Sequence, residues 1–298
     1  MATDSLQVKA ISATSSAPPG IQEQPTLAKL IDVSTCIGCK ACEVACQEWN
    51  DLVASENVPF FGSYQTLPDL DANFWNLIKF NEVERDDHLM WNMTKYQCMH
   101  CTDPGCLIAC PAPGAIVQYV NGIVDFDQDQ CIGCGLCITG CPFDVPRVST
   151  ATGKVYKCTM CSDRVGAGLE PACIKACPTN CLHFGTKEQL VQIGNARVSD
   201  LNEEGYKNAS LYDPEGVGGT QVVYVLPHGD RPKDYGLPEN PQLSLAVILW
   251  KRPLKWLGGI MMAGGIFAAF THYLCYGPKD LNEAEPALKE EQSGQENL

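Results

Sequence analysis

Hydrophobic residues form one uninterrupted run near the C-terminus of this 298-residue chain. Residues 256–276, WLGGIMMAGGIFAAFTHYLCY, contain no Asp, Glu, Lys or Arg. As a helix this run has a length of about 31 Å at ~1.5 Å per residue, which matches the ~30 Å hydrocarbon thickness of a bilayer. Trp256, Tyr273 and Tyr276 stand where interfacial aromatic residues are common. The run predicts a single membrane-spanning helix rather than a buried helix of a globular domain.

Upstream, shorter periodic stretches predict β-structure. Residues 74–84, FWNLIKFNEVE, and residues 88–96, HLMWNMTKY, are typical of two strands around a polar turn. Residues 115–127, AIVQYVNGIVDFD, predict a hairpin in which Asn121 and Gly122 form a type I′ turn. Strands and short helices together indicate an α+β domain.

The rest of the pattern separates ordered segments from connecting ones. Residues 182–210 predict a strand followed by a helix, and residues 211–226 predict a Gly-rich turn and a strand. Residues 227–250 begin Pro-rich and predict a linker, and residues 279–298 predict an acidic tail. Residues 1–28 predict an extended arm without a signal peptide, because no basic segment precedes an apolar run and no twin-Arg pair occurs.

Cysteine supplies the candidate chemistry, with 18 residues in the chain. Residues 131–142, CIGCGLCITGCP, have the Cys-x₂-Cys-x₂-Cys-x₃-Cys-Pro spacing of a ferredoxin-type ligand run. Three other groups pair a Cys-x₂-Cys with a closing Cys-x₃-Cys, although their middle gaps differ. Sixteen cysteines therefore fall into four quartets: Cys36, Cys39, Cys42 and Cys46; Cys98, Cys101, Cys106 and Cys110; Cys131, Cys134, Cys137 and Cys141; Cys158, Cys161, Cys173 and Cys177.

Disulfide bonds and zinc sites fit this cysteine spacing less well than iron–sulfur clusters do. Disulfide-rich domains are mostly short, and their cysteines do not recur in quartets with a trailing Pro. Zinc sites use Cys pairs that lie a dozen or more residues apart. A structural zinc scaffold that docks partners remains the alternative from another functional class.

A few chemically capable side chains lie outside this plan. Cys181 and Cys275 are expected to be packed residues rather than ligands. His100, inside the second quartet, is expected to pack near a cluster or donate a hydrogen bond to it. His272, at one end of the apolar run, is interpreted as a polar interface residue in preference to a haem neighbour.

Charge and motif content exclude several functions. The chain has 35 acidic and 21 basic residues, for a net charge of −14. This balance argues against nucleic-acid binding, which needs a basic footprint. GVGGT, at residues 216–220, lacks the Gly-Lys-Ser/Thr ending of a phosphate-binding loop. No nucleophile–base pair or other catalytic constellation stands out.

The layout of quartet, hairpin and quartet resembles a bacterial two-cluster ferredoxin, in which the fourth Cys of each run ligates the other cluster. The adjacent second and third quartets then pair, and the first pairs with the fourth. Four predicted [4Fe–4S] ligand sets follow: set 1, Cys36, Cys39, Cys42 and Cys177; set 2, Cys98, Cys101, Cys106 and Cys141; set 3, Cys110, Cys131, Cys134 and Cys137; set 4, Cys46, Cys158, Cys161 and Cys173.

This pairing predicts two ferredoxin-like modules, one inserted in the other, and a C-terminal transmembrane helix. The outer module is expected to consist of residues 29–97 and 142–226, and the inner module of residues 98–141. The linker is expected at residues 227–250 and the anchor at residues 251–278.

The chain resembles the iron–sulfur (beta) subunit of membrane-bound respiratory formate dehydrogenase. The resemblance runs from about residue 29 to residue 278. It is carried by KLIDVSTCIGCKACEVACQEWND, YKCTMCSDRVGAGLEPACIKACPT, LYDPEGVGGTQVVYVL and the C-terminal apolar run. Nitrate-reductase relatives carry Trp at one ligand position, where this chain has Cys. The equivalent subunit of a membrane-bound hydrogenase, or of another molybdenum oxidoreductase, is the alternative.

The resemblance implies an electron-transfer subunit in a three-part complex. A catalytic subunit with a molybdenum or tungsten pterin would deliver electrons to set 1. Set 2 would face the haem of a cytochrome b subunit that reduces quinone, and the anchor would pack on this cytochrome among membrane lipid. The subunit itself would be non-catalytic.

Two arguments disagree on the side of the membrane. Lys251, Arg252 and Lys255 precede the span, and Lys279 and Lys289 follow it. The positive-inside rule weakly favours a cytoplasmic cluster domain. The family resemblance implies a periplasmic one, exported with the catalytic partner. We expect the periplasmic side, because the rule rests on short loops rather than on folded domains.

Overall fold

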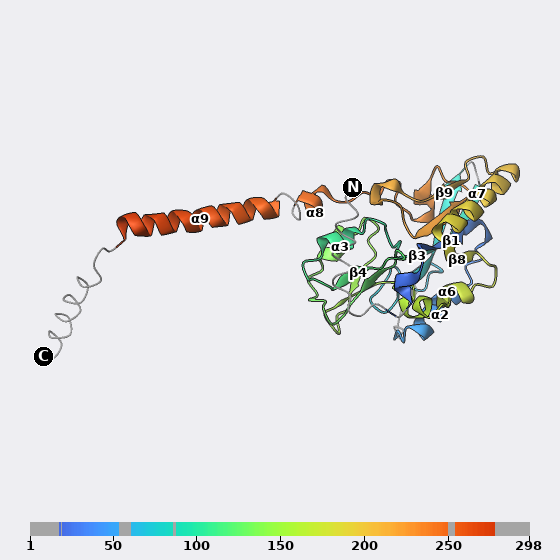
Figure 1. Cartoon of the computed structure of the whole chain (residues 1–298). Coiled ribbons are helices and arrows are strands. Elements are labelled where there is room, and N and C mark those ends of the chain that lie inside the picture. The colour runs from blue at the N-terminus through green and yellow to red at the C-terminus, as the bar shows by residue number, and fades with distance from the viewer. Residues whose placement is uncertain (1–17, 19, 54–60, 86–87, 250–253, 278–298) are drawn as a thin grey trace, which may run out of the picture. The chain divides into compact units, whose positions relative to one another are not determined.

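The computed structural model describes residues 18, 20–53, 61–85, 88–249 and 254–277. The acidic tail and residues 1–17 and 19 of the predicted arm lie outside this part of the chain. The rest of the predicted arm is not simply extended, because residues 21–23 form a helical turn with a buried Ile21, and a strand begins at Leu27. The chain divides into two units, residues 1–248 and residues 249–298. The first unit carries all the cysteine quartets, and the second carries the long helix α9, Lys255–Tyr276 (Figure 1).

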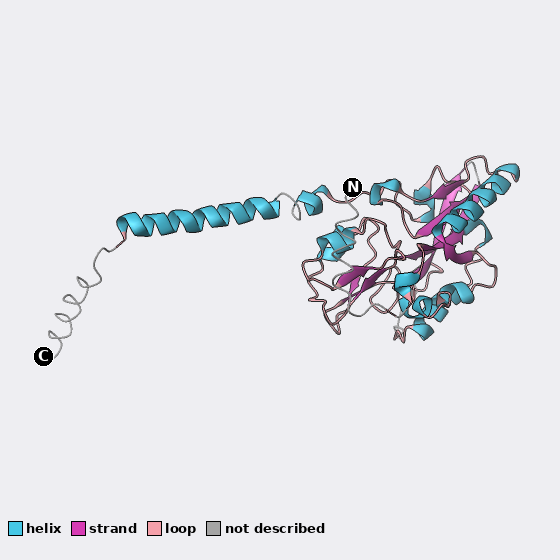
Figure 2. Ribbon diagram, viewed as in Figure 1, coloured by secondary structure: helices cyan, strands magenta, loops and turns pink. Residues whose placement is uncertain are grey.

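A four-stranded sheet closes the first unit around segments that are far apart in sequence. Strand β1, Leu27–Asp32, pairs in parallel with β10, Val222–Leu226, and antiparallel with β8, Leu182–Thr186. Strand β9, Ser210–Tyr212, pairs antiparallel with β10 and gives the order β8–β1–β10–β9. Figure 2 draws the strands in magenta. The β-branched run of β10 is buried along its whole length, as expected for a strand covered on both faces.

One face of this sheet is covered by α7, Lys187–Glu203. The hydroxyl of Thr186 caps the helix by accepting the Gln189 N–H at 3.3 Å. Leu190 and Leu201 then pack in one cluster with Leu30, Val223 and Val225 of the sheet. The opposite face belongs to the main core, which contains most of the buried cysteines. The predicted order of strand and helix over 182–210 is therefore confirmed.

Two hairpins project from this core. Strands β2, Asn76–Arg85, and β3, His88–Gln97, pair along their full length, as the alternating pattern predicted. Leu77 and Ile78 lie in the buried half of the long hairpin. The short hairpin consists of β4, Ile116–Gln118, and β5, Val124–Phe126.

The turn of the short hairpin differs from the predicted type I′ turn. A type I′ turn needs positive φ at both central residues, and only Gly122 has it, at 90°. The Gly122 N–H donates to the Tyr119 carbonyl at 2.9 Å, and the Tyr119 N–H donates to the Ile123 carbonyl at 2.8 Å. The loop therefore has three residues and ends in a left-handed glycine, which is the arrangement of a G1 bulge. The Asn121 side chain instead accepts the Ile123 N–H at 3.2 Å.

Short helices bring the quartets together in pairs. Helix α2 packs against α6, and α3 packs against α4. The first pair joins the first and fourth quartets, and the second pair joins the second and third. Five short helices carry ligand cysteines or directly follow them: α2, Ala41–Trp49; α3, Gly105–Ala109; α4, Leu136–Gly140; α5, Ser162–Gly166; α6, Ala172–Lys175.

Minor elements complete the first unit. The remaining two-stranded pairing joins β6, Arg147–Val148, and β7, Val155–Tyr156. Three single-turn helices lie between larger elements: η1, Ile21–Glu23; η2, Val33–Thr35; η3, Glu215–Val217.

Part of the segment that we expected to be a linker is packed instead. Residues 232–235 form η4, Pro232–Tyr235, and both Tyr235 and Leu237 are buried in the main core. Arg85 of β2 forms an ion pair with Asp234 at 2.6 Å. The proline content suggested an extended connection. Pro232 instead occupies the first position of a helical turn, where the fixed φ of proline is favourable. A short helix α8, Leu245–Leu249, follows.

The second unit contains the one helix in the described residues that is long and apolar enough to cross a membrane, Trp256–Tyr276. Its bounds agree with the predicted span. The side chains at 256–276 are nearly all exposed, and the added Cβ of a residue at Gly258, Gly259, Gly264 or Gly265 meets only open space.

The contact between α3 and α4 depends on two glycines. A Cβ added at Gly105 collides with the Gly140 carbonyl, and one added at Gly140 lies 2.6 Å from the Ala109 Cβ. We expect Gly140→Ala to separate these helices and destabilise the protein by about 1–3 kcal/mol, as overpacking does. A thermal shift of cluster bleaching measures this effect. Gly185→Ala is the control, because its Cβ makes ordinary contacts, and an equal shift in both variants contradicts the prediction.

Candidate iron–sulfur centres

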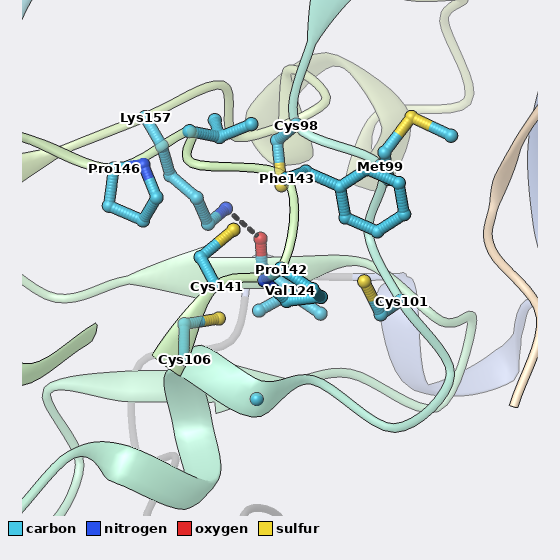
Figure 3. A pocket seen from close by; sticks show the side chains of 12 residues that line it. Cys98, Met99, Cys101, Cys106, Val124, Cys141, Pro142, Phe143, Pro146 and Lys157 are labelled. Carbon is cyan, nitrogen blue, oxygen red and sulfur yellow. Dashed lines mark hydrogen bonds between the residues drawn. The ribbon is translucent and has the colours of Figure 1, made fainter. Parts of the chain in front are cut away.

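The four thiols of set 2 surround one cavity. Cys98, Cys101 and Cys106 line it together with Cys141, which comes from the next quartet. Figure 3 shows the four sulfur atoms around this space, with Phe143 and Val124 on its wall. The cavity has an empty volume of about 340 Å³. The pairing of three local cysteines with one distant cysteine is the arrangement of a two-cluster ferredoxin.

Sets 3 and 4 surround two further cavities. The set 3 thiols line a cavity of about 300 Å³ with Ile116 and Phe126. The set 4 thiols line a cavity of about 250 Å³ with Gln97 and Lys29. Each cavity contains all four cysteines of its predicted set and no cysteine of another set.

The set 1 thiols are related to one another through Cys181. Electrostatic interactions join the thiols of Cys36, Cys42 and Cys177 to that of Cys181. Cys39 lies in the loop between η2 and α2 and is exposed. Cys181 is buried, as expected, but its thiol hydrogen-bonds to that of Cys36.

A common backbone conformation positions the first thiols of the quartets. The residue two positions after the leading Cys has positive φ in all four: 63° at Gly38, 46° at His100, 70° at Gly133 and 57° at Met160. The backbone N–H of His100 points at Cys98 Sγ, and that of Met160 at Cys158 Sγ, each at 3.4 Å. His and Met adopt this region at an energetic cost, which marks it as a requirement of the site.

Burial opposes ionisation of the ligand thiols. Burial raises the pKa of Cys98 to about 11 and the pKa values of Cys42 and Cys46 to about 12. Cys173 is different: burial raises its pKa, but Lys29, whose Nζ is 3.4 Å from the sulfur, lowers it below the ordinary value. Metal ligands must be thiolates, so binding of iron has to overcome the raised pKa values of thiols such as Cys42, Cys46 and Cys98.

Spare donors around the cavities suit iron–sulfur clusters. The Gln97 side chain lines the set 4 cavity, and its Nε2 has no hydrogen-bond partner in the described part of the chain. His100 Nε2 also lacks a partner in this part of the chain, although His100 lines none of the three cavities. His100 Nδ1 accepts the Val124 N–H at 3.1 Å, and burial holds the imidazole pKa well below its ordinary value, so the proton stays on Nε2. Thiolate and sulfide sulfur are acceptors for such N–H groups, so the donor set fits four-iron clusters.

The spacing of these side chains differs from that of a mononuclear site. Among the described residues, no three His, Cys, Asp or Glu side chains converge closely enough to hold a single metal ion. The cysteines of sets 2, 3 and 4 are instead spread around cavities.

Interactions between sets give their spatial order. Cys42 of set 1 interacts electrostatically with Cys173 of set 4. Cys98 of set 2 interacts with Cys158 of set 4, and Cys106 of set 2 interacts with Cys137 of set 3. The sets therefore follow one another as 1–4–2–3. In the first unit, the exposed ligand cysteines are Cys39 of set 1 and Cys134 of set 3, at the two ends of this row.

Comparison with known proteins agrees with this arrangement. The 4Fe-4S dicluster domain matches twice, over residues 35–115 and 89–187. The formate dehydrogenase iron-sulfur subunit of Haemophilus influenzae is 53% identical over 95% of this chain and 91% of that protein. The chain belongs to the family of formate dehydrogenase iron–sulfur subunits.

Other members of the formate dehydrogenase iron–sulfur subunit family agree over nearly the whole length. The formate dehydrogenase-O iron-sulfur subunit of Escherichia coli is 52% identical over 97% of this chain and 96% of that protein. The nitrate-inducible formate dehydrogenase iron-sulfur subunit of the same organism is 49% identical over 96% of this chain and 98% of that protein. The family described as formate dehydrogenase N, transmembrane, matches residues 243–286. The chain is thus a membrane-anchored member with two dicluster domains.

Sequence reasoning missed three buried lysines around the cavities. Lys29 lies on β1, Lys95 on β3, and Lys157 directly precedes Cys158. Their relative exposures are 2%, 1% and 3%. Basic residues on alternating strands usually face solvent, so only the adjacency of Lys157 to a ligand gave any signal.

The site predicts unequal effects for two buried cysteines. We expect Cys106→Ala to remove one cluster, so that the iron content falls from about sixteen to about twelve per chain. Cys181→Ala should leave the iron content unchanged, because Cys181 belongs to none of the four sets. Iron and acid-labile sulfide analysis of the purified complex checks both variants. An iron loss of the same size in Cys181→Ala contradicts the assignment of set 1.

Proposed function

We propose that this chain is the electron-transfer subunit of a membrane-bound respiratory formate dehydrogenase. It carries electrons from a catalytic subunit with a molybdenum or tungsten pterin to a membrane cytochrome b and then to quinone. The observation that carries the proposal is the row of four thiol sets, 1–4–2–3, whose two end sets reach the surface. Each [4Fe–4S] cluster, when bound, accepts and donates one electron.

Electrons enter at set 1 and leave at set 3. Ile37, beside Cys39, is 60% exposed, and Ile132, beside Cys134, is 68% exposed. An apolar side chain next to an exposed ligand suits a partner surface that excludes water from the transfer path. This exit differs from the one that the family resemblance implied: the ligands Cys98, Cys101 and Cys106 of set 2 are buried inside the row.

The protein holds the clusters apart from water between these ends. Phe143, Val145 and Met99 form part of the wall of the set 2 cavity, and all three are buried. The low polarity of this wall prevents proton-coupled side reactions and keeps the thiolate ligands from exchanging. The N–H groups of His100 and Met160 hold two ligand sulfurs in place.

The helix α9 anchors the relay in the membrane. Its glycines at 258, 259, 264 and 265 have open space on the Cβ side, and small residues at these spacings permit close packing of a partner helix. Cytochrome b and membrane lipid are the partners that such a helix suits. His272, whose ring lies 5.3 Å from that of Tyr276, is interpreted as an interface residue.

Formate should reduce the clusters in the purified complex. We expect formate to bleach the visible absorption of the clusters in seconds, and hydrogen to have no effect. A Cys39→Ala variant should slow this bleaching strongly because it alters the entry set, while dithionite should still reduce the remaining clusters. Bleaching by hydrogen, or co-purification of a nickel–iron subunit, identifies the chain as a hydrogenase subunit instead. A colourless, zinc-loaded protein defeats the electron-transfer role altogether.

The cluster domain is proposed to lie on the periplasmic side of the cytoplasmic membrane. An external protease should degrade it in intact spheroplasts, whereas a cytoplasmic marker protein should survive. Protection of the cluster domain until the spheroplasts are lysed contradicts the periplasmic orientation and favours the cytoplasmic one.

A further inference from the structure

Three lysines are buried among the cluster cavities without an ion pair. Lys29, Lys95 and Lys157 belong to different segments, and in the described part of the chain none has a carboxylate within ion-pair distance. An ammonium group in a protein interior is unfavourable unless a negative charge compensates it. Asp125 interacts electrostatically with Lys157, and Glu43 with Lys95, but neither forms an ion pair, and the partners of Lys29 are the thiols of set 4. The thiolates of the predicted sets therefore contribute compensating charge to all three lysines.

Lys157 lies between set 2 and set 4. Its side chain lines the set 2 cavity, where Figure 3 shows it donating to the Val124 carbonyl. It also donates to the carbonyl of Cys158, a set 4 ligand, at 2.8 Å. The nearby carboxylate of Asp125 interacts electrostatically with Lys157 and accepts hydrogen bonds from the Ser162 hydroxyl at 2.6 Å and from the Phe126 N–H.

Lys95 lies between set 1 and set 4. It interacts electrostatically with Cys36 and Cys42 on one side and with Cys46 and Cys173 on the other. Its ammonium donates to Gln97 Oε1, and the same Gln97 lines the set 4 cavity. The lysine therefore also polarises an amide that faces that cavity.

Lys29 acts on set 4 alone. It lines the cavity and its Nζ lies 3.4 Å from Cys173 Sγ. Set 4 is thus the one set contacted or flanked by all three buried ammonium groups. The lining of the set 3 cavity, in contrast, contains no basic side chain, and Lys154, whose ammonium donates to the Cys131 carbonyl at 2.6 Å, is only partly buried.

We propose that Lys29, Lys95 and Lys157 are built-in counter-charges that raise the reduction potential of the set 4 cluster. Lys95 also raises the potential of the set 1 cluster, and Lys157 also raises that of the set 2 cluster. A four-iron cluster with four thiolates has a net charge of about −2 oxidised and about −3 reduced. A nearby positive charge stabilises the reduced form more. The proposal rests on the proposed cluster ligation.

The test is an EPR-monitored redox titration of the whole purified complex. Lys29→Met, Lys95→Met and Lys157→Met remove the charge and keep a side chain of similar length. We expect one and the same cluster signal to shift to lower potential in all three variants. A tenfold change in its oxidised-to-reduced ratio corresponds to a shift of about 59 mV for one electron. A second signal should shift with Lys95→Met and a third with Lys157→Met, while the fourth stays unchanged.

Two controls separate charge from structure. Lys233→Met removes an equal charge from the exposed surface, where Lys233 pairs with Glu239 at 3.0 Å, and should shift no signal. Lys157→Arg keeps the charge and should retain the wild-type potentials or lose far less than Lys157→Met. If a Met variant loses iron while the matching Arg variant retains it, the counter-charge is required for cluster binding, which supports the proposal.

Three results overturn the proposal: unchanged potentials in fully loaded Met variants, the same shift in Lys233→Met, or iron loss in both the Met and Arg variants at one position. Failure of the proposed function gives a different result, since the wild-type complex then lacks the four cluster signals before any substitution is made.

Discussion

Each proposed cluster site depends on a thiol supplied from a distant part of the chain. Three cysteines of each set belong to one quartet, and the fourth belongs to another quartet. Cys177 is this fourth cysteine in set 1, and Cys141 is the fourth in set 2. Short helices meet in pairs to make this exchange, and the close approach of Gly105 and Gly140 shows how tightly one pair is packed. The sheet of β1, β8, β9 and β10 closes the outer module over the same exchange.

Burial then determines the electrostatics of the sites. Most ligand thiols lie in the interior, where burial raises their pKa values, and the same interior contains unpaired ammonium groups. Neither group is favourable alone, because each is a charged or chargeable group removed from water. In the proposed sites, the positive charges of iron and of the ammonium groups balance the negative charges of the thiolates. Among the acidic residues in the described part of the chain, only Asp32, Glu43 and Asp125 are buried.

Local spacing explains what could be predicted from the sequence. The quartets, the long β2–β3 hairpin and the apolar helix are properties of short segments, and the structure groups the thiols of sets 2, 3 and 4 as the ferredoxin pairing predicted. The order of the sets and the burial of Lys29 and Lys95 depend on how distant segments pack, which spacing does not encode. The prediction of a type I′ turn at Gly122 was wrong because the Asn-Gly sequence also suits a bulged three-residue loop. Pro232 and Tyr235 lie in a packed turn because side-chain burial outweighed the local preference for an open connection.

The exchange of thiols between quartets also sets the order in which the chain can mature during translation. Residues 98–141 contain every thiol of sets 2 and 3, but Lys157 and Val155 also line their cavities, so these cavities can close only once residues 142–157 have been made. Set 4 waits for Cys173 and set 1 for Cys177, and β1 gains its parallel neighbour only when Val222–Leu226 has been made. The first-synthesised cysteines are therefore among the last to be enclosed, and set 1, the proposed entry end, is finished after set 3, the proposed exit end.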